Sequence, residues 1–168
     1  HFEVDGQRLL GALHVPEAVG EGLPGLVLLH GWAGYRIGAH QMFVKLAREA
    51  ESRGFACLRF DFRGRGDSEG DMSEASLSTM IRDACEAARV LLCEAGVKDV
   101  ALVGDCSGSE VAIGAGPLIP SCRALVLWSA PIVAGSRVRT DRAKRKHIVL
   151  QYLAKLLRPQ TWSKLIAG

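Results

Sequence analysis

Short apolar segments alternate with amphipathic segments along most of this chain. Continuous apolar runs predict strands buried on both faces of a sheet, at 26–29, 55–60, 100–103 and 124–128. Between them, apolar side chains at helical spacing predict helices over 39–50 and 77–92, each followed by a glycine. Because strands that alternate with helices favour right-handed crossovers, we expect an α/β fold with a mostly parallel sheet and flanking helices.

The N-terminal segment predicts an antiparallel hairpin. Phe2–Val4 leads into Asp5-Gly6, a dipeptide that suits the positive φ angles of a tight hairpin turn. The return strand is expected over 8–15 and ends at Pro16.

The C-terminal segment predicts helices and no further strand. Residues 141–166 read as two basic helices, broken at Pro159, with an apolar face. We therefore expect an α/β core over residues 1–134 and a basic helical cap or lid over 135–168.

The segment 104–108, GDCSG, is the strongest candidate for chemistry. It lies between a predicted buried strand and a helix-like run that begins at Glu110, so it forms a Gly-x-nucleophile-x-Gly turn with Cys106 at its centre. Gly104 and Gly108 are needed because side chains at these two positions would collide across a sharp bend. Backbone N–H groups at the helix N-terminus would favour the Cys106 thiolate.

A second motif, HGWAG at 30–34, directly follows the strand predicted at 26–29. A glycine-bearing loop there can turn a backbone N–H toward a developing oxyanion, with Trp32 N–H and Ser107 N–H as the paired donors and Gly31 giving the loop freedom. His30 could act as a general base, but we expect it to hold this loop by hydrogen bonds.

A third motif, FDFRGRGDSEG at 60–70, begins where the strand predicted at 55–60 ends. Its acids could serve a catalytic or metal site. We favour loop support for Asp61, because Arg63 and Arg65 are interleaved with the carboxylates and can pair with them.

The order of these three motifs resembles the α/β-hydrolase superfamily over residues 8–130. Within it, YRIGAH at 35–40 and LRPQTWSKL at 157–165 resemble the hydrolases associated with bacterial exosortase systems, and a cysteine at this turn is similar to dienelactone hydrolases. The resemblance implies a catalytic triad in the chain order nucleophile, acid, histidine.

The two triad partners are harder to place. After Cys106 the sequence holds two acids, Glu110 and Asp141, and one histidine, His147. Asp141 and His147 share a basic helical stretch instead of following separate strands. We therefore expect the acid and histidine beyond residue 168, and expect the isolated 168-residue chain to be inactive and prone to associate through an unpaired sheet edge.

We expect hydrolysis of an ester, thioester or related acyl bond of a small molecule, by way of an acyl-enzyme on Cys106. Acyl transfer to an acceptor other than water, or a non-catalytic binding protein of the same fold, are the alternatives. The motifs imply no metal and no organic cofactor.

Charge and cysteine usage bear on the expected partners and cellular location of the protein. From residue 137 onward the sequence holds nine Lys and Arg and one acid. Such a basic segment is more often a solvated helix face than a membrane-binding surface, and it contains no nucleic-acid motif. The five cysteines have no repeated short spacing, so we expect no disulfide framework and a cytoplasmic location. Cys57 falls in an apolar strand pattern and Cys85 and Cys93 on a helical pattern, so we expect these three to be small buried residues.

Overall fold

The computed structural model describes residues 1–130. Its strands are β1 (Phe2–Val4), β2 (Gln7–Leu9), β3 (Gly11–His14), β4 (Gly25–Leu29), β5 (Cys57–Phe60), β6 (Val100–Asp105) and β7 (Cys122–Trp128). Its helices are α1 (Met42–Ser52), α2 (Leu77–Ala95) and α3 (Ser107–Ala115), with short 3₁₀ turns η1 (Ala39–Gln41), η2 (Met72–Glu74) and η3 (Gly116–Leu118). The predicted cap over 135–168 lies outside the described residues.

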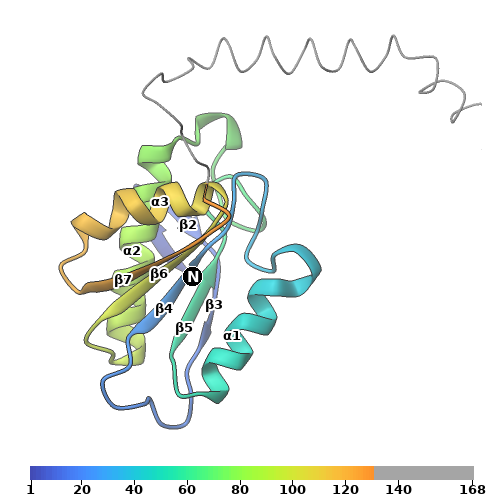
Figure 1. Cartoon of the computed structure of the whole chain (residues 1–168). Coiled ribbons are helices and arrows are strands. Elements are labelled where there is room, and N and C mark those ends of the chain that lie inside the picture. Colours follow the sequence, from blue (N-terminus) through green and yellow to red (C-terminus); the bar gives the residue numbers. More distant parts are fainter. Residues whose placement is uncertain (131–168) are drawn as a thin grey trace, which may run out of the picture. The chain divides into compact units, whose positions relative to one another are not determined.

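Five strands form one sheet in the order β3-β5-β4-β6-β7 (Figure 1). β5, β4, β6 and β7 are parallel, and β3 pairs antiparallel with β5. The carboxyl ends of β5, β4 and β6 therefore meet at one edge of the sheet, and the three sequence motifs follow these ends.

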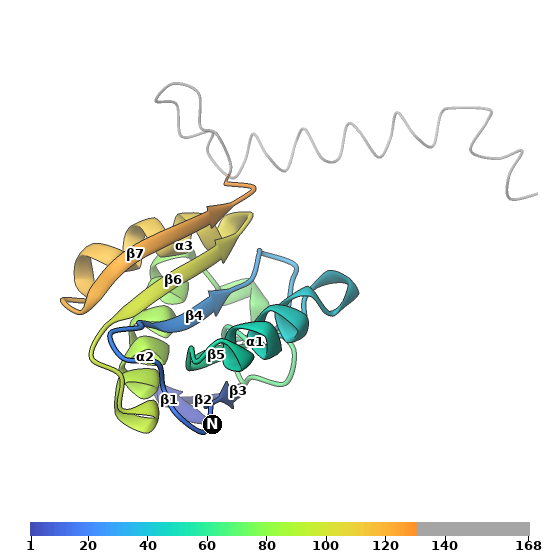
Figure 2. The ribbon, with the colours of Figure 1, turned by 60° about the horizontal axis from the view of Figure 1, so that its bottom comes forward.

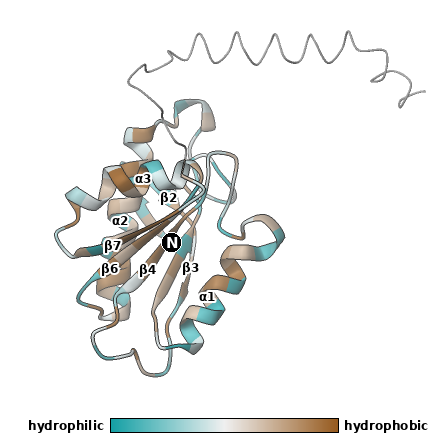
Figure 3. Cartoon of the chain, in the orientation of Figure 1, coloured by the Kyte–Doolittle hydropathy of each residue, from teal (hydrophilic) through white to brown (hydrophobic). Residues whose placement is uncertain are grey.

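Helices cover both faces of the sheet, as Figure 2 shows with α1 on one side and α2 and α3 on the other. The alternation within β4 explains this. Val27 and Leu29 join the larger core cluster with α2 and α3, whereas Leu28 packs in a second cluster with Phe43 of α1. Figure 3 shows that apolar residues dominate the central strands and α3. The predicted α/β fold with a mostly parallel sheet is confirmed.

The predicted hairpin forms, but its return strand is shorter than expected. β1 pairs with β2 across Asp5 and Gly6, whose φ angles of 51° and 77° are those of a tight turn. The expected strand 8–15 breaks at Leu10, whose N–H donates to Ser68 Oγ and whose carbonyl accepts the Asp61 N–H. The remainder, β3, moves to the edge of the main sheet.

The helix predicted over 39–50 begins at Met42, three residues later than expected. His40 and Gln41 have left-handed φ angles of 50° and 62°, which interrupt an α-helix, so η1 precedes α1 as a separate turn. The helix predicted over 77–92 is α2, which starts with a Ser76 capping box and ends at Gly96 with φ 63°.

Within residues 1–130, β7 pairs with β6 and has no partner on its other side. Its side chains Leu125–Trp128 are 40–51% exposed although all are large and apolar. Among the described helices, none is both long and apolar enough to cross a membrane.

Candidate functional site

Cys106 occupies a sharp bend between β6 and α3. Its φ of 52° and ψ of −121° are a strained combination for a residue with a side chain, and such strain is concentrated at functional sites. The thiol is exposed. The Cys106 N–H donates to the Trp128 carbonyl at the end of β7, 2.9 Å away, so the neighbouring strand holds the bend in place.

The two glycines of the motif allow the close approach that this bend requires. A Cβ on Gly104 would lie 2.4 Å from the Gly108 carbonyl oxygen, and a Cβ on Gly108 would lie 2.1 Å from the Leu29 carbonyl oxygen. Both contacts are with backbone, which cannot move aside as the end of a flexible side chain can. α3 is thereby seated directly against the end of β4.

The loop after β4 lies against the bend. A Cβ on Gly31 would be 3.2 Å from Cys106 Cβ and 3.8 Å from its Sγ, so the absence of a side chain at Gly31 leaves the space beside the sulfur open. The Gly34 N–H donates to the Gly31 carbonyl over 2.9 Å and tightens the loop into a turn. Within residues 1–130, neither Trp32 N–H nor Ser107 N–H donates to a backbone acceptor.

His30 is buried and uses both ring nitrogens to hold the loops. Nδ1 donates to the Gly31 carbonyl at 2.8 Å, and Nε2 accepts the Phe62 N–H at 3.3 Å. Burial lowers the pKa of His30, which favours the neutral ring that this pair of bonds needs. With no free nitrogen, His30 is poorly suited to be a general base.

Asp61 is fully buried at the end of β5 and ties two loops together. Its carboxylate accepts from the backbone N–H and the guanidinium of Arg36, and from the Asp67 N–H at 3.1 Å. Gly66, with φ 53°, must approach because a Cβ there would lie 2.1 Å from the Asp61 carboxylate. The loops after β4 and β5 are therefore fixed to each other.

The expected pairing of Arg63 and Arg65 with the acids of their own motif is wrong. Arg63 instead forms a buried ion pair with Asp83 of α2 at 2.5 Å and a second with Asp5 at 3.0 Å. Arg65 forms no ion pair in the described part of the chain and donates through Nε to the Trp32 carbonyl at 2.6 Å. The sheet order places the loop after β4 beside the one after β5, which brings Trp32 to Arg65, whereas the partners of Arg63 lie on α2 and in the turn between β1 and β2.

A pocket of about 370 Å³ lies beside Trp32. It is lined by the two loops just described, through Trp32, Ala33, Gly34, Tyr35, Gly64, Arg65, Gly66 and Met72. Apolar and aromatic groups make up most of its wall, and Arg65 is its one charged residue. Such a lining suits the apolar part of a small molecule.

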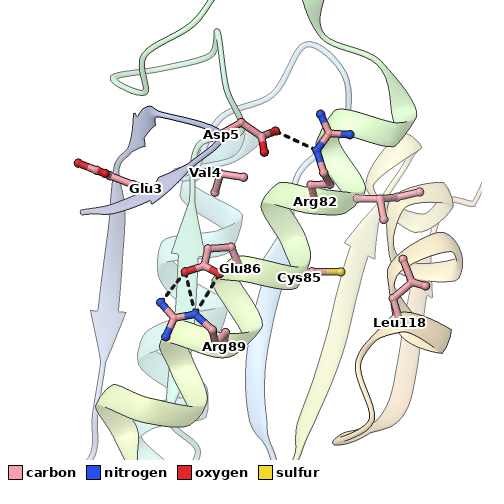
Figure 4. Close-up of a pocket in the computed structure, with 9 residues that line it drawn as sticks. Glu3, Val4, Asp5, Arg82, Cys85, Glu86, Arg89 and Leu118 are labelled. Atoms are coloured by element: carbon pink, nitrogen blue, oxygen red, sulfur yellow. Dashed lines mark hydrogen bonds and ion pairs between the residues drawn. The ribbon is translucent and has the colours of Figure 1, made fainter.

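A second pocket, of about 470 Å³, lies between β1, α2 and η3 and is drawn in Figure 4. Four of its five charged residues are paired with one another, Arg82 with Asp5 at 2.8 Å and Arg89 with Glu86 at 2.5 Å, and Glu3 is the fifth. None of the candidate site residues lines it. We therefore place the candidate site at the carboxyl ends of the strands.

Two histidines of the described chain are at least partly buried, His14 and His30, and the hydrogen bonds of both are to groups other than Cys106. His14 of β3 contacts Glu51 and accepts from Arg59. It is in register with Cys57 at the start of β5, at the opposite end of the parallel strands from Cys106. Asp141 and His147 lie outside the described residues.

The cysteines other than Cys106 only partly follow the expectation of burial. All five are free; Cys57 is buried, and burial raises the pKa of its thiol to about 12. Cys85 is partly buried and Cys93 is exposed. Cys93 lies on the outer side of α2, which the apolar pattern alone did not reveal.

Comparison with known proteins decides the family. A family profile described as the alpha/beta hydrolase fold matches residues 24–160. The chain belongs to the α/β-hydrolase family. Its narrower resemblance to hydrolases of exosortase systems stays a prediction.

Two curated relatives share local similarity with this α/β-hydrolase chain. Protein ABHD12B of Homo sapiens is 34% identical over 102 residues, which are 61% of this chain and 27% of that protein. The lysophosphatidylserine lipase ABHD12 of Gallus gallus is 40% identical over 62 residues, 37% of this chain and 16% of that protein. The chain thus spans a minor part of the curated relatives it matches.

Solved structures share the fold. Est1E from Butyrivibrio proteoclasticus, determined with ferulic acid bound, has a TM-score of 0.61 at 25% identity. The match covers 73% of this chain and 49% of the Est1E chain. The α/β hydrolase GrgF from Penicillium sp. sh18 has a TM-score of 0.68 at 21% identity. The match covers 98% of this chain and 53% of the GrgF chain.

Proposed function

We propose that the protein is a hydrolase of ester, thioester or related acyl bonds, with Cys106 as its nucleophile. One observation carries this: an exposed sulfur at positive φ, at the junction of a central strand and a helix, with Gly31 leaving space beside it. A cysteine that packs in the core is buried, as Cys57 is, whereas reactive cysteines are at least partly exposed. The names of the relatives, a lipase and an esterase complex, agree with an acyl substrate.

The reaction begins when the deprotonated Cys106 Sγ attacks the carbonyl carbon. A C–S bond forms, and the π electron pair moves to the carbonyl oxygen, giving a tetrahedral oxyanion. As the oxyanion collapses, the bond to the leaving alcohol or thiol breaks and the leaving group takes up a proton. Water then attacks the acyl-enzyme, releasing the carboxylic acid and restoring the thiol.

The Trp32 and Ser107 N–H groups are the proposed oxyanion donors. Trp32 follows Gly31 in the loop after β4, and Ser107 follows Cys106 at the start of α3. Neither has a backbone acceptor among residues 1–130, so both are free for a ligand oxygen. Losing one such donor typically costs about a hundredfold or more in kcat.

Deprotonation of Cys106 falls to a histidine from outside residues 1–130, oriented by an acid, in the order that the family pattern implies. The pocket beside Trp32 would receive the apolar part of the substrate. We also propose a cytoplasmic location, in keeping with five free cysteines.

The test is turnover of a panel of p-nitrophenyl esters and acyl thioesters by the longest form of the protein that its gene encodes. Cys106→Ala should abolish turnover, whereas Cys93→Ala, which removes another exposed thiol, should leave it unchanged. Turnover that survives in Cys106→Ala at the parent rate would overturn the proposal. Adding amine or alcohol acceptors and identifying the products separates hydrolysis from acyl transfer.

A further inference from the structure

Arg65 is a buried cation that forms no ion pair within residues 1–130. Its side chain is 5% exposed, and within residues 1–130 no carboxylate lies within salt-bridge distance. Burial lowers the pKa of its guanidinium. The charge of the buried Asp83 opposes this effect, but from beyond ion-pair distance, so the position of Arg65 depends on the hydrogen bonds and the ring contact that it makes.

Those contacts converge on one residue, Trp32. Nε donates to the Trp32 carbonyl at 2.6 Å, and the guanidinium carbon lies 4.5 Å from the centroid of the Trp32 ring. Nη1 donates to the Arg63 carbonyl at 3.2 Å, which anchors the guanidinium in its own loop. Nη2 is buried without a partner, so Arg65 satisfies only part of its hydrogen-bonding capacity.

Two groups of Trp32 are therefore fixed from one side, its carbonyl and its ring. Within residues 1–130 Trp32 forms no other hydrogen bond, and the residue is 42% exposed. The remaining polar groups of Trp32 are its indole N–H and its backbone N–H, and the backbone N–H has no backbone acceptor in the described part of the chain. The backbone N–H lies in the peptide plane that precedes Trp32, and the φ and ψ torsions of Trp32 join that plane to the carbonyl. Arg65 holds the carbonyl and the ring, so it restrains one end of these torsions.

We infer that Arg65 is a positioning residue that aims the Trp32 N–H at the oxyanion formed on Cys106. This inference rests on the proposed function. Its physical basis is that an oxyanion donor must be correctly placed before the charge forms, and a displacement of about 1 Å can cost about a hundredfold in rate. A cation stacked on the Trp32 ring and bonded to its carbonyl supplies that placement without itself donating to the oxyanion.

The experiment compares two reactions of Cys106, of which only one passes through an oxyanion. Acylation by p-nitrophenyl acetate passes through an oxyanion, whereas alkylation by iodoacetamide is a displacement at a tetrahedral carbon and forms none. Both rates are measured at Cys106 by mass spectrometry in the longest form of the protein, for the parent, Arg65→Gln, Arg65→Lys and a control, Arg59→Gln. Arg59 lies in β5 and contacts His14 instead of the site loops.

Arg65→Gln should slow acylation by about 10- to 100-fold while alkylation keeps the parent rate. Arg65→Lys keeps the charge but loses the forked donor, so its acylation rate should fall between the two. Arg59→Gln should change neither rate. In steady state, the Arg65→Gln defect should lie in kcat and leave KM near the parent value.

Equal losses of acylation and alkylation in Arg65→Gln would show a merely structural role, and unchanged acylation would show no role; either overturns the inference. If Arg65→Gln does not fold, Arg65→Lys carries the same comparison. Failure of the proposed function looks different: the parent protein would then be alkylated at Cys106 but not acylated there.

Discussion

Gly104 and Gly108 lie so close across the bend at Cys106 that a Cβ on Gly104 would be 2.4 Å from the Gly108 carbonyl oxygen. The spacing of the GDCSG motif is thus a packing requirement: α3 can follow β6 directly only where both flanking side chains are missing. The same closeness seats α3 on β4 and leaves the thiol, at the bend itself, outside the packed core.

Substituting these glycines should therefore unfold the site. Gly104→Ala and Gly108→Ala should each lower the free energy of unfolding by about 3 kcal/mol, because the clash is with backbone. Gly22→Ala is the control without a clash: a Cβ there meets nothing within 4 Å, and its φ of 71° adds a backbone penalty that Gly104 and Gly108 do not have, so about 1 kcal/mol is expected. Equal losses in all three variants, measured by urea denaturation, would contradict this account.

His30 predicts a specific pH dependence of stability. Burial holds its pKa below the ordinary 6.5, so the unfolded chain binds a proton at this residue before the folded chain does. The free energy of unfolding should therefore fall as pH drops below about 6.5 toward the folded-state pKa, and it should be flat with respect to this group above 6.5.

The His30→Asn variant tests that assignment. The amide can still donate to the Gly31 carbonyl but cannot titrate, and it leaves the Phe62 N–H unsatisfied. We expect a loss of about 2 kcal/mol at pH 7.5 and a shallower decline below pH 6.5 than in the parent. An identical pH profile for parent and variant would show that another group is responsible.

Asp61 and Asp67 both contact Arg36 but should differ sharply in how much they contribute to the free energy of unfolding. Asp61 is fully buried and accepts from two loops, whereas the Asp67 carboxylate is 65% exposed. Asp61→Asn should cost about 3 kcal/mol, because it breaks a buried charge pair, and Asp67→Asn less than about 1 kcal/mol. Thermal unfolding of the two variants beside the parent measures the difference, and similar losses would count against the role given to Asp61.

The sheet and its helices were predictable because their signals are local. Apolar runs marked β4, β6 and β7, and Gly96 with its positive φ stands where α2 ends. The break at Leu10 was missed because it depends on Ser68, which the chain brings to it from another loop.

The partners of the charged residues in the motif at 60–70 were missed because they also come from distant parts of the sequence. Interleaved charges suggested that Arg63 and Arg65 pair with neighbouring acids, but β5 lies beside β4 in the sheet, and this brings Arg36 to Asp61 across 25 positions of sequence. Arg63 points instead to Asp83 on α2. No spacing in the sequence marks contacts that depend on strand order.

The position of covalent modification tests the central claim most directly. Treating the longest form of the protein with an acyl-type probe and mapping the labelled peptide should place the acyl group on Cys106, with Cys106→Ala unlabelled and Cys93→Ala labelled as the parent is. Acyl label found on another residue, or equal labelling of Cys106→Ala, would contradict Cys106 as the nucleophile.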